Sequence, residues 1–506
     1  GCYRMGSNRT LIGLYRLLTG LGLVPTIYQA ARQRKSPREG ILLLPRTFKR
    51  ALTVLTTLGL GTAAAIGPSL GTAATAARVV PIPSVTGHIY QQTLSFPPTT
   101  SQCLALFGIH CYQPAQFAKA YNLNALHAAG IDGRGKTILI VDSFGSPTLA
   151  HDLHVFDQTF GLPDPPSLVI RQDAGPVPAY DSTNGDMFGW AIETTLDVEY
   201  AHVFAPGAKI VVEATPVSET EGVQGFPEIV TAENYAINHH LGDVISQSFG
   251  ATEETFPSAQ SILALRGSFL NAQRHNVTVL GASGDLGATD FEFNALDIYP
   301  FRVNSWPSSD PLVTSVGGTQ LTLDDDGNRL QPDVVWNDGF GAGGGGVSAV
   351  FARPDFQNRV RKVVGNHRGT PDISMSAAVD GAAVMYWSFS PRPGYHLVGG
   401  TSEASPEFAG IVAMADQMAG ERLGNINSAL YRLGQKHAEG IVDVTSGNNT
   451  FGPFMNSDGI TYTVIGYNAT RGYDLASGWG TLDAAQFVPE LARTAGEGDQ
   501  GGDGGD

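Results

Sequence analysis

Four short apolar runs, each ending at a turn that contains Gly, Ser or Pro, limit the folds open to this chain of 506 residues. The runs are KTILIVDSFG at 136–145, AKIVVEATP at 208–216, DVISQSFG at 243–250 and VTVLGASGD at 277–285. Helical stretches such as 186–203 and 258–275 lie between them. Buried strands that alternate with helices indicate an α/β fold, with a mainly parallel β-sheet flanked by helices on both faces. The functional sites of such sheets form at the carboxyl ends of the strands.

The start of the chain is typical of an export segment. Residues 1–50 hold ten basic side chains against one acid, and this basic leader begins with Gly rather than Met, so we interpret it as a possible start-site artefact. Residues 51–76 carry no charge and end in small residues, which predicts a signal peptide cleaved after Ala76. An uncleaved membrane anchor over 51–77 is the alternative. We therefore expect a secreted protein, or a membrane-anchored one whose main domain lies outside.

The remainder divides into three parts. Residues 77–113 contain Pro and Thr and little periodicity, so we interpret them as a linker or a short pro-segment. The regular pattern predicts one large domain over 114–490, which we expect to be a monomer. Residues 491–506 end in a disordered Gly/Asp tail that cannot build a core.

The balance of charge argues against nucleic acid as a partner. The chain has 31 basic and 47 acidic side chains, so 21 basic against 46 acidic side chains follow residue 50, a net charge of −25. Binding to phosphates needs clustered Lys and Arg, which an acidic body does not offer. The three cysteines form no C-x-x-C motif, so zinc and iron–sulfur sites are not expected. Cys103 and Cys111 are either a small disulfide loop, as export favours, or two free thiols.

The segment GGTSEASPEFAGIVA at 399–413 holds a candidate nucleophile. Gly399 and Gly400 permit a tight turn, after which Ser402 opens a helix whose unpaired backbone N–H groups can face a developing oxyanion. We expect Pro406 in the first helical turn, where a missing N–H costs nothing. A lone Ser at this place would be an ordinary helix cap. The full pattern G-T-S-x-x-x-P-x-x-A-G favours a nucleophile instead.

A serine nucleophile needs a base, and no His of this chain lies in an H-G-T-type segment. Glu193 and Asp197 are spaced i and i+4 and so share one face of a predicted helix. Two solvated surface acids are the alternative, but apolar residues surround the pair. Asp285 follows an apolar strand, where an Asx-turn is the default interpretation. When protonated, its carboxyl can donate a hydrogen bond to an oxyanion.

Together these motifs resemble those of the sedolisin, or serine-carboxyl peptidase, family, whose fold is subtilisin-like. The resemblance runs from about Tyr112 to about Gly480 and includes VISQSFG, DPLVTSVGGT, VVWNDGFGAGGGGVSAVFARPDFQ and RGTPDISM. It implies an endopeptidase acting on proteins or peptides, in which Glu193 is the base for Ser402. Asp197 would be hydrogen-bonded to Glu193, and Asp285 would complete the oxyanion hole.

The resemblance also implies one structural calcium ion near the end of the domain. Asp443 and Asp474 would supply carboxylates, and Val444, Thr470 and Gly472 would supply backbone carbonyls. Oxygen ligands of this kind suit calcium. By spacing alone, Asp443 and Asp474 would be two ordinary loop acids.

The chain departs from the family pattern at two positions and in one segment. Gly399 stands where the family has Ser, Glu403 stands where it has a small residue, and the segment before the domain is short for a propeptide. Glu403 would either shift local pKa values or face solvent. These departures motivate one alternative, a catalytically inactive surface-binding homologue. Two others are a tripeptidyl-peptidase, since the family includes both kinds of peptidase, and a subtilisin-type triad that uses Asp142, for which no His is placed.

The resemblance predicts activity in acid. Glu193 must be ionised to take the proton of Ser402, whereas Asp285 must be protonated to donate to the oxyanion. Since both kinds of carboxyl have ordinary pKa values near 4, the pH range that suits both lies in acid.

Overall fold

The computed structural model describes residues 90–496. The predicted leader at 1–50 and the predicted signal peptide or anchor at 51–76 lie outside the described residues. Among residues 90–496, every helix is too short or too polar to cross a membrane.

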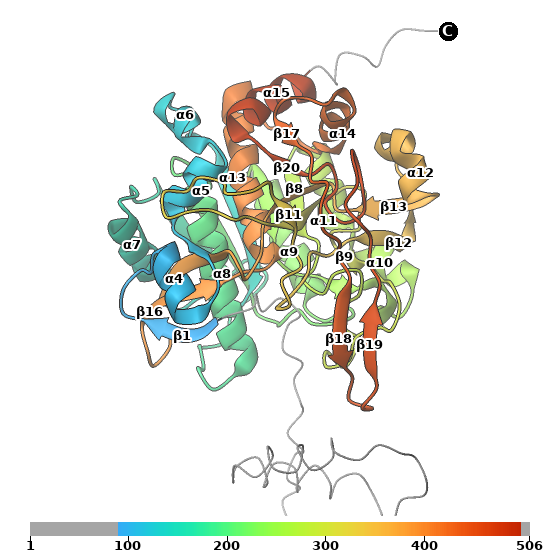
Figure 1. The fold of residues 1–506 in the computed structure, drawn as a ribbon, viewed down its shortest axis with the longest axis horizontal. Coiled ribbons are helices and arrows are strands. Elements are labelled where there is room, and N and C mark those ends of the chain that lie inside the picture. The colour runs from blue at the N-terminus through green and yellow to red at the C-terminus, as the bar shows by residue number, and fades with distance from the viewer. Residues whose placement is uncertain (1–89, 497–506) are drawn as a thin grey trace, which may run out of the picture. The chain divides into compact units, whose positions relative to one another are not determined.

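An eight-stranded sheet forms the centre of the domain (Figure 1). Its strand order is β11-β10-β8-β6-β3-β5-β4, and β14 also pairs with β10. The strands are β3 (Thr137–Ser143), β4 (Leu168–Arg171), β5 (Lys209–Thr215), β6 (Val244–Gln247), β8 (Thr278–Ala282), β10 (Thr314–Gln320), β11 (Val334–Val335) and β14 (Ile373–Ser376). Neighbouring strands are parallel except β10 and β11. The predicted mainly parallel sheet is confirmed, and the four predicted apolar runs are β3, β5, β6 and β8.

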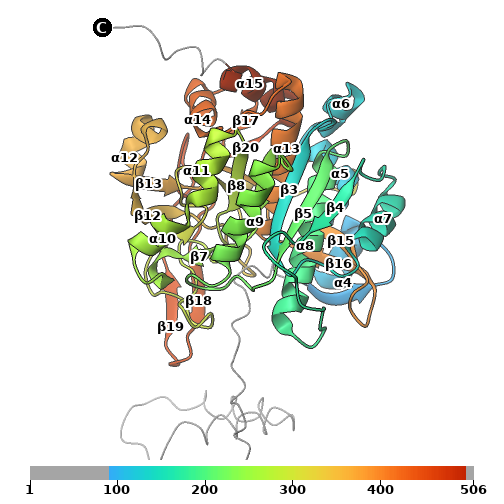
Figure 2. The ribbon, with the colours of Figure 1, turned by 180° about the vertical axis from the view of Figure 1, so that it is seen from behind.

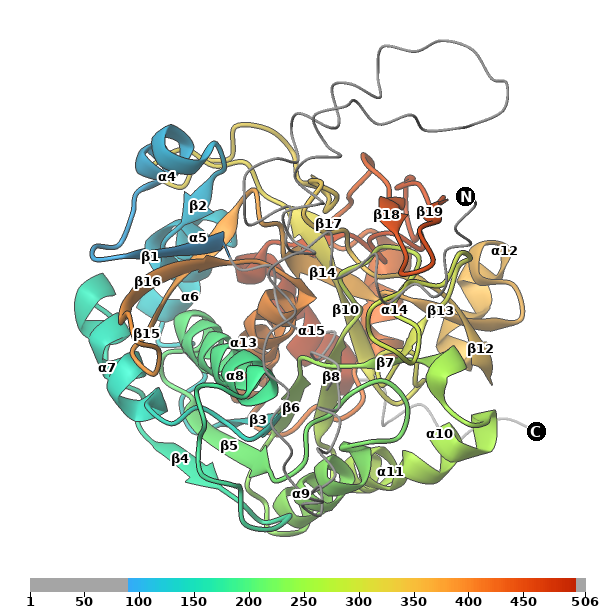
Figure 3. The same cartoon turned by 90° about the horizontal axis from the view of Figure 1, so that it is seen from below.

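Helices cover both faces of this sheet (Figures 2 and 3). The helices are α7 (Leu149–Phe160), α8 (Gly185–Phe204), α9 (Phe226–Asn238), α10 (Ala259–Leu265), α11 (Gly267–Arg274), α13 (Thr401–Ala419), α14 (Asn427–Lys436) and α15 (Ala484–Gly496). In Figure 3, α8 and α13 lie on one side of β3 and β6, and α9 lies on the other. The predicted helix at 258–275 is interrupted at Arg266, between α10 and α11.

Alternate residues of the strands fill two separate cores. Ile138 and Ile140 belong to the core shared with α8 and α13, while Leu139 and Val141 belong to the core shared with α9 and α11. This is the two-residue period of a strand that is buried on both faces. It explains why the sequence shows unbroken apolar runs instead of alternation.

A smaller sheet holds the beginning of the described chain. Its order is β1-β16-β15-β2, formed by β1 (Tyr90–Leu94), β16 (Gly394–Val398), β15 (Ala382–Trp387) and β2 (Cys111–Tyr112). Helix α4 (Thr100–Phe107) lies between β1 and β2, and Cys103 is joined to Cys111 by a disulfide, as one of the two interpretations predicted. Residues 90–113 are therefore part of the folded domain, which corrects their interpretation as a linker. These residues belong to the domain because they pair with strands far away in the sequence, and local sequence patterns do not predict such pairing.

The remaining elements lie around the two sheets. They are α5 (Pro114–Ala120), α6 (Leu123–Ala128), α12 (Arg361–Val364), the 3₁₀ segments η1 (Glu253–Thr255) and η2 (Asp355–Val360), and the pairs β7 (Ala251–Thr252) with β9 (Ser305–Trp306), β12 (Gly346–Ala352) with β13 (His367–Thr370), β17 (Ile441–Val442) with β20 (Thr481–Leu482) and β18 (Phe451–Met455) with β19 (Thr461–Val464). Helix α15 extends to Gly496, so the predicted tail at 491–506 begins later than expected. Its last ten residues lie outside the described chain.

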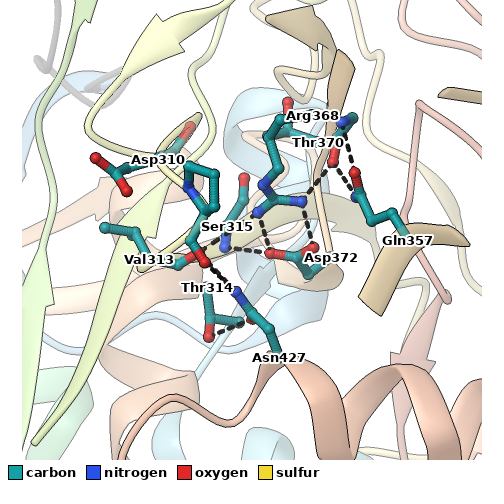
Figure 4. Close-up of polar contacts among 12 residues, drawn as sticks. Asp310, Val313, Thr314, Ser315, Gln357, Arg368, Thr370, Asp372 and Asn427 are labelled. Carbon is teal, nitrogen blue, oxygen red and sulfur yellow. Dashed lines mark hydrogen bonds and ion pairs between the residues drawn. The ribbon is translucent and has the colours of Figure 1, made fainter. Parts of the chain in front are cut away.

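A buried ion pair ties several of these elements together (Figure 4). Arg368 in β13 donates to both carboxylate oxygens of Asp372, at 2.6 and 2.5 Å, and both side chains are fully buried. Asp372 also accepts from the backbone N–H of Ser315 in β10 and from the hydroxyl of Tyr431 in α14, each at 2.8 Å. The carboxylate of Asp372, directly before β14, therefore links β10, β13 and α14.

Candidate active site

Ser402 lies at the start of α13, where the predicted tight turn places it. Gly400 precedes the helix with φ 150°, in the region that favours glycine. Gly399 is required for a different reason: a Cβ there would lie 2.8 Å from the backbone nitrogen of Val379. The close approach of two backbone segments thus explains why glycine occupies position 399.

Pro406 is not in the first helical turn, which corrects that expectation. It lies inside α13, five residues after Thr401. Because proline has no N–H, the carbonyl of Ser402 receives no hydrogen bond from the helix at that place. The hydroxyl of Ser248, in the turn after β6, lies 3.2 Å from this carbonyl oxygen and 2.8 Å from Oδ1 of Asp197. Because Pro406 leaves the carbonyl of Ser402 without a helical hydrogen bond, this carbonyl is available to Ser248, whose hydroxyl connects α13 with α8.

Glu193 and Asp197 are buried on α8, so the interpretation of two solvated surface acids is wrong. Glu193 is 3% exposed, and the hydroxyl of Ser402 acts on its carboxyl. Burial and then the nearby charges of Asp197 and Asp142 raise the pKa of Glu193 well above its usual range, while the Ser402 hydroxyl lowers it. Burial also raises the pKa of Asp197, and the charge of Asp142 adds to this effect.

Asp285 follows β8 and is held against the first residue of α13. Its Oδ1 accepts from the backbone N–H of Thr401 at 2.7 Å and from the Thr401 hydroxyl at 2.8 Å. Asp285 lines the same pocket as Ser402. Two segments that are more than a hundred residues apart thus place a carboxyl beside the candidate nucleophile.

Asp142 belongs to the same group of carboxyls. It lies in β3, is fully buried, and has a pKa raised to about 7 by burial. Its charge acts on Glu193 and Asp197, so three carboxyls share one dry region of the core. The ionisable groups that act on Glu193 are carboxyls, which does not favour the alternative of a triad with histidine.

Glu403 does not face solvent. It is fully buried on α13, and Glu407 is buried one turn further along the same helix. Burial raises the pKa of Glu403 well above its usual range, the Ser376 hydroxyl lowers it, and the charge of Asp285 raises it further. The structure therefore favours the other interpretation of Glu403, a residue that shifts pKa values near the site.

The residues of the predicted calcium site come from two segments, one directly after β17 and one at 470–474, which a hydrogen bond joins. Asp443 Oδ2 accepts from the N–H of Gly472 at 2.9 Å, and Asp474 Oδ2 accepts from the N–H of Thr470 at 2.7 Å. Among residues 90–496 no group of three or more His, Cys, Asp or Glu side chains is placed to hold a metal ion. An ion here would depend on backbone carbonyls. Those of Val444, Thr470 and Gly472 accept none of the hydrogen bonds formed by the described residues, so this oxygen-only donor set fits calcium chemistry.

The sequence interpretation gave no role to Ser248 or Thr401. Ser248 lies in the quoted run VISQSFG, but one hydroxyl among three polar residues gives no signal of what it contacts. Thr401 is a neighbour of Ser402 in the G-T-S motif, yet only the folded chain brings Asp285 to it.

Comparison with known proteins agrees with this fold. The subtilase family profile matches residues 184–427. Kumamolisin from Bacillus sp. (strain MN-32) is 31% identical over 400 residues, which cover 76% of this chain and 64% of kumamolisin. Human tripeptidyl-peptidase 1 is 28% identical over 427 residues, 79% of this chain and 68% of that protein.

Among solved structures, Pseudomonas sedolisin, a serine-carboxyl proteinase in complex with two molecules of pseudo-iodotyrostatin, is similar with a TM-score of 0.64. It is 26% identical, and the match covers 76% of this chain and 99% of sedolisin in that structure. The fold and the site define a subtilisin-like α/β protein. More narrowly, the chain belongs to the sedolisin family, which confirms the resemblance. It spans just under two thirds of the length of kumamolisin.

Proposed function

We propose that this chain is a secreted, acid-acting serine-carboxyl endopeptidase that hydrolyses proteins or peptides through an acyl-enzyme on Ser402. The observation that carries this proposal is the position of Ser402, which lies at the start of α13, lines a pocket, and acts on the buried carboxyl of Glu193. A serine near a buried base beside a pocket has the arrangement that nucleophilic catalysis needs.

Each carboxyl then has a separate task. The hydroxyl oxygen of Ser402 attacks the scissile carbonyl carbon while its proton passes to Glu193. Asp197 stabilises Glu193 in position, and a proton on Oδ2 of Asp285 donates to the oxyanion. Oδ1 of Asp285 is suited to its anchoring role because it already accepts two hydrogen bonds from Thr401. Collapse of the intermediate expels the amine, which takes the proton from Glu193, and water then hydrolyses the ester on Ser402.

This mechanism predicts a bell-shaped dependence of kcat/KM on pH with a maximum in acid. Activity rises as Glu193 ionises. Since burial raises the pKa of Glu193, the rising limb should lie above the ordinary glutamate value of 4.5. Activity falls at higher pH as Asp285 loses its proton. The rising and falling parts of the pH–activity curve both depend on interacting carboxyls. Each apparent pKa value therefore describes the group of carboxyls and not a single residue.

The measurement is the rate of cleavage of a protein substrate from pH 2 to about 8, with the products mapped by mass spectrometry. A maximum at about pH 7 or above would contradict the proposed mechanism. Product mapping also separates two modes of cleavage, because relatives of this chain include tripeptidyl-peptidase 1. Internal fragments are expected from an endopeptidase, whereas tripeptides released in sequence from the amino terminus would assign the other mode.

A calcium ion bound by the loop at 470–474 is a separate proposal. Asp443 and Asp474, with the carbonyls of Val444, Thr470 and Gly472, would hold the ion and join this loop to the end of β17. Asp474 suits this role because its Oδ2 accepts a single hydrogen bond, which leaves capacity for a cation.

Calcium removal is expected to lower the temperature of unfolding, because an ion that binds only the native state stabilises it. The measurement is thermal unfolding of the full chain with excess Ca²⁺ and with chelator. Asp443→Asn should abolish the difference between the two conditions. Asp458→Asn, which changes an exposed acid of the β18–β19 turn, should keep it. An identical unfolding temperature in both conditions for the unchanged protein would refute the site.

A further inference from the structure

A pocket opens beside Ser402 between two backbone segments. One segment follows β6 and the other follows β8. The space between them, counted together with the open solvent at its mouth, is about 310 Å³, of which about 20 Å³ is free for the centre of a water molecule. Its lining residues include Ser248, Gly250, Gly284, Asp285, Asp290 and Ser402. A peptide whose carbonyl carbon lies at the Ser402 hydroxyl would direct the side chain of that same residue into this pocket. We call that residue the acyl-side residue.

Asp290 lines this pocket with a buried carboxyl. It is 8% exposed; its Oδ2 accepts from the hydroxyl of Ser305 at 2.6 Å, and its Oδ1 accepts from the N–H of Phe291 at 2.8 Å. Gly284, at φ 110°, faces the carboxyl: a Cβ on Gly284 would lie 3.5 Å from Oδ2 of Asp290. The lack of a side chain at Gly284 therefore leaves the carboxyl accessible from the pocket.

Among the described residues no basic side chain lines the pocket, and the charge that acts on Asp290 is that of the Asp285 carboxyl after β8. The charge of Asp290 acts in turn on three further carboxyls, Glu219 and Glu221 in the loop after β5 and Glu254 beside them in η1. Burial, and to a smaller extent the charge of Asp285, raise the pKa of Asp290 to about 6. Burying an ionised carboxylate without a countercharge costs free energy. When Asp290 is ionised, the pocket therefore favours a ligand that carries a positive charge.

We propose that Asp290 selects substrates with Lys or Arg as the acyl-side residue. Its carboxylate would pair with the cationic end of that side chain, while Ser248 and Ser305 offer hydroxyls to the remaining donors. This inference rests on the proposed peptidase function of Ser402. It goes beyond that function because it names the class of bond that is cleaved.

The test uses four peptides that differ only at the acyl-side residue, which is Lys, Arg, norleucine or Leu. Norleucine keeps the linear chain of Lys without its charge. For the unchanged protein at pH 6 we expect kcat/KM for Lys and Arg to exceed that for norleucine about ten-fold or more. The ratio should rise from pH 4 to pH 6 because a larger fraction of Asp290 is then ionised, given its pKa of about 6.

Asp290→Asn is expected to bring the ratio of Lys to norleucine to within about three-fold of unity. Glu292→Gln is the matched control: it removes a charge from the same loop, two residues away and outside the pocket lining, and should keep the ratio. If Asp290→Asn does not fold, Ser305→Ala serves instead. It removes the hydroxyl that supports the ionised carboxylate and should lower the ratio at pH 6.

Equal cleavage of the Lys and norleucine peptides at pH 6 would overturn the proposal, as would an Asp290→Asn variant that keeps the preference. A basic preference at another substrate position would overturn it too. If no peptide is cleaved, the proposed peptidase function fails. The Asp290 proposal is then decided by calorimetry on the Ser402→Ala variant, to which the Lys peptide must bind more tightly than the norleucine peptide.

Discussion

Replacing Ser402 with Ala is expected to lower kcat/KM for a peptide substrate by about a thousand-fold or more, because the attacking oxygen is lost. Glu193→Gln should cause a loss of similar size, since the amide cannot accept the proton of Ser402. The double variant should be no slower than either single variant, because the two residues act as one unit. Steady-state kinetics at the pH of maximal activity measures all three.

Ser405→Ala is the matched control for this experiment. Ser405 lies on the same helix, is fully buried, forms a hydrogen bond with Ser246 at 2.9 Å, and does not line the pocket beside Ser402. Its loss should leave kcat/KM within a few-fold of the original value. A Ser402→Ala protein that still cleaves peptides would exclude Ser402 as nucleophile. Absence of a hemiacetal between the unchanged protein and a peptide aldehyde would instead favour the inactive surface-binding homologue.

The largest expected effect on stability comes from breaking the buried ion pair of Figure 4. Asp372→Ala leaves the guanidinium of Arg368 buried without its partner and removes the acceptor of Ser315 and Tyr431. We expect the free energy of unfolding to fall by about 3–5 kcal/mol. Denaturant unfolding followed by fluorescence measures the change.

Arg134→Ala is the control for this prediction. Arg134 forms an ion pair with Asp132, but its side chain is 64% exposed, so water can replace the lost interaction. The variant should unfold at the same denaturant concentration as the unchanged protein. If Asp372→Ala also unfolds at the denaturant concentration of the unchanged protein, the buried ion pair does not stabilise the fold.

Local patterns predicted the strands and helices well because their causes are local. The runs that became β3, β5, β6 and β8 have consecutive apolar residues, as is typical of strands buried on both faces. Residues 90–113 were misjudged because β1 and β2 are stabilised by pairing with β16 and β15, which are distant in the sequence: Tyr90 pairs with Leu397 and Cys111 with Ala382. Pairing between strands so far apart in the sequence produces no hydrophobic periodicity that can be recognised in a short segment.

In the candidate site too, local patterns predict some features, while distant contacts decide others. Spacing places Glu193 and Asp197 on one helix face, and the G-T-S pattern places Ser402 at a helix start. Neither pattern tells whether a carboxyl is buried. Burial depends on which distant elements pack against α8 and α13, and burial is what raises the pKa of Glu193 and of Glu403.

The sequence by itself determined the α/β class, the family and the identities of the candidate catalytic residues, because these follow from short patterns and their order along the chain. Only the tertiary structure decided that Glu403 is buried, that Ser248 meets the carbonyl left without a helix bond by Pro406, and that Asp290 lines the pocket beside Ser402. The physical reason is that contacts and desolvation arise between segments far apart in sequence, whereas periodicity and turn chemistry act within a few residues.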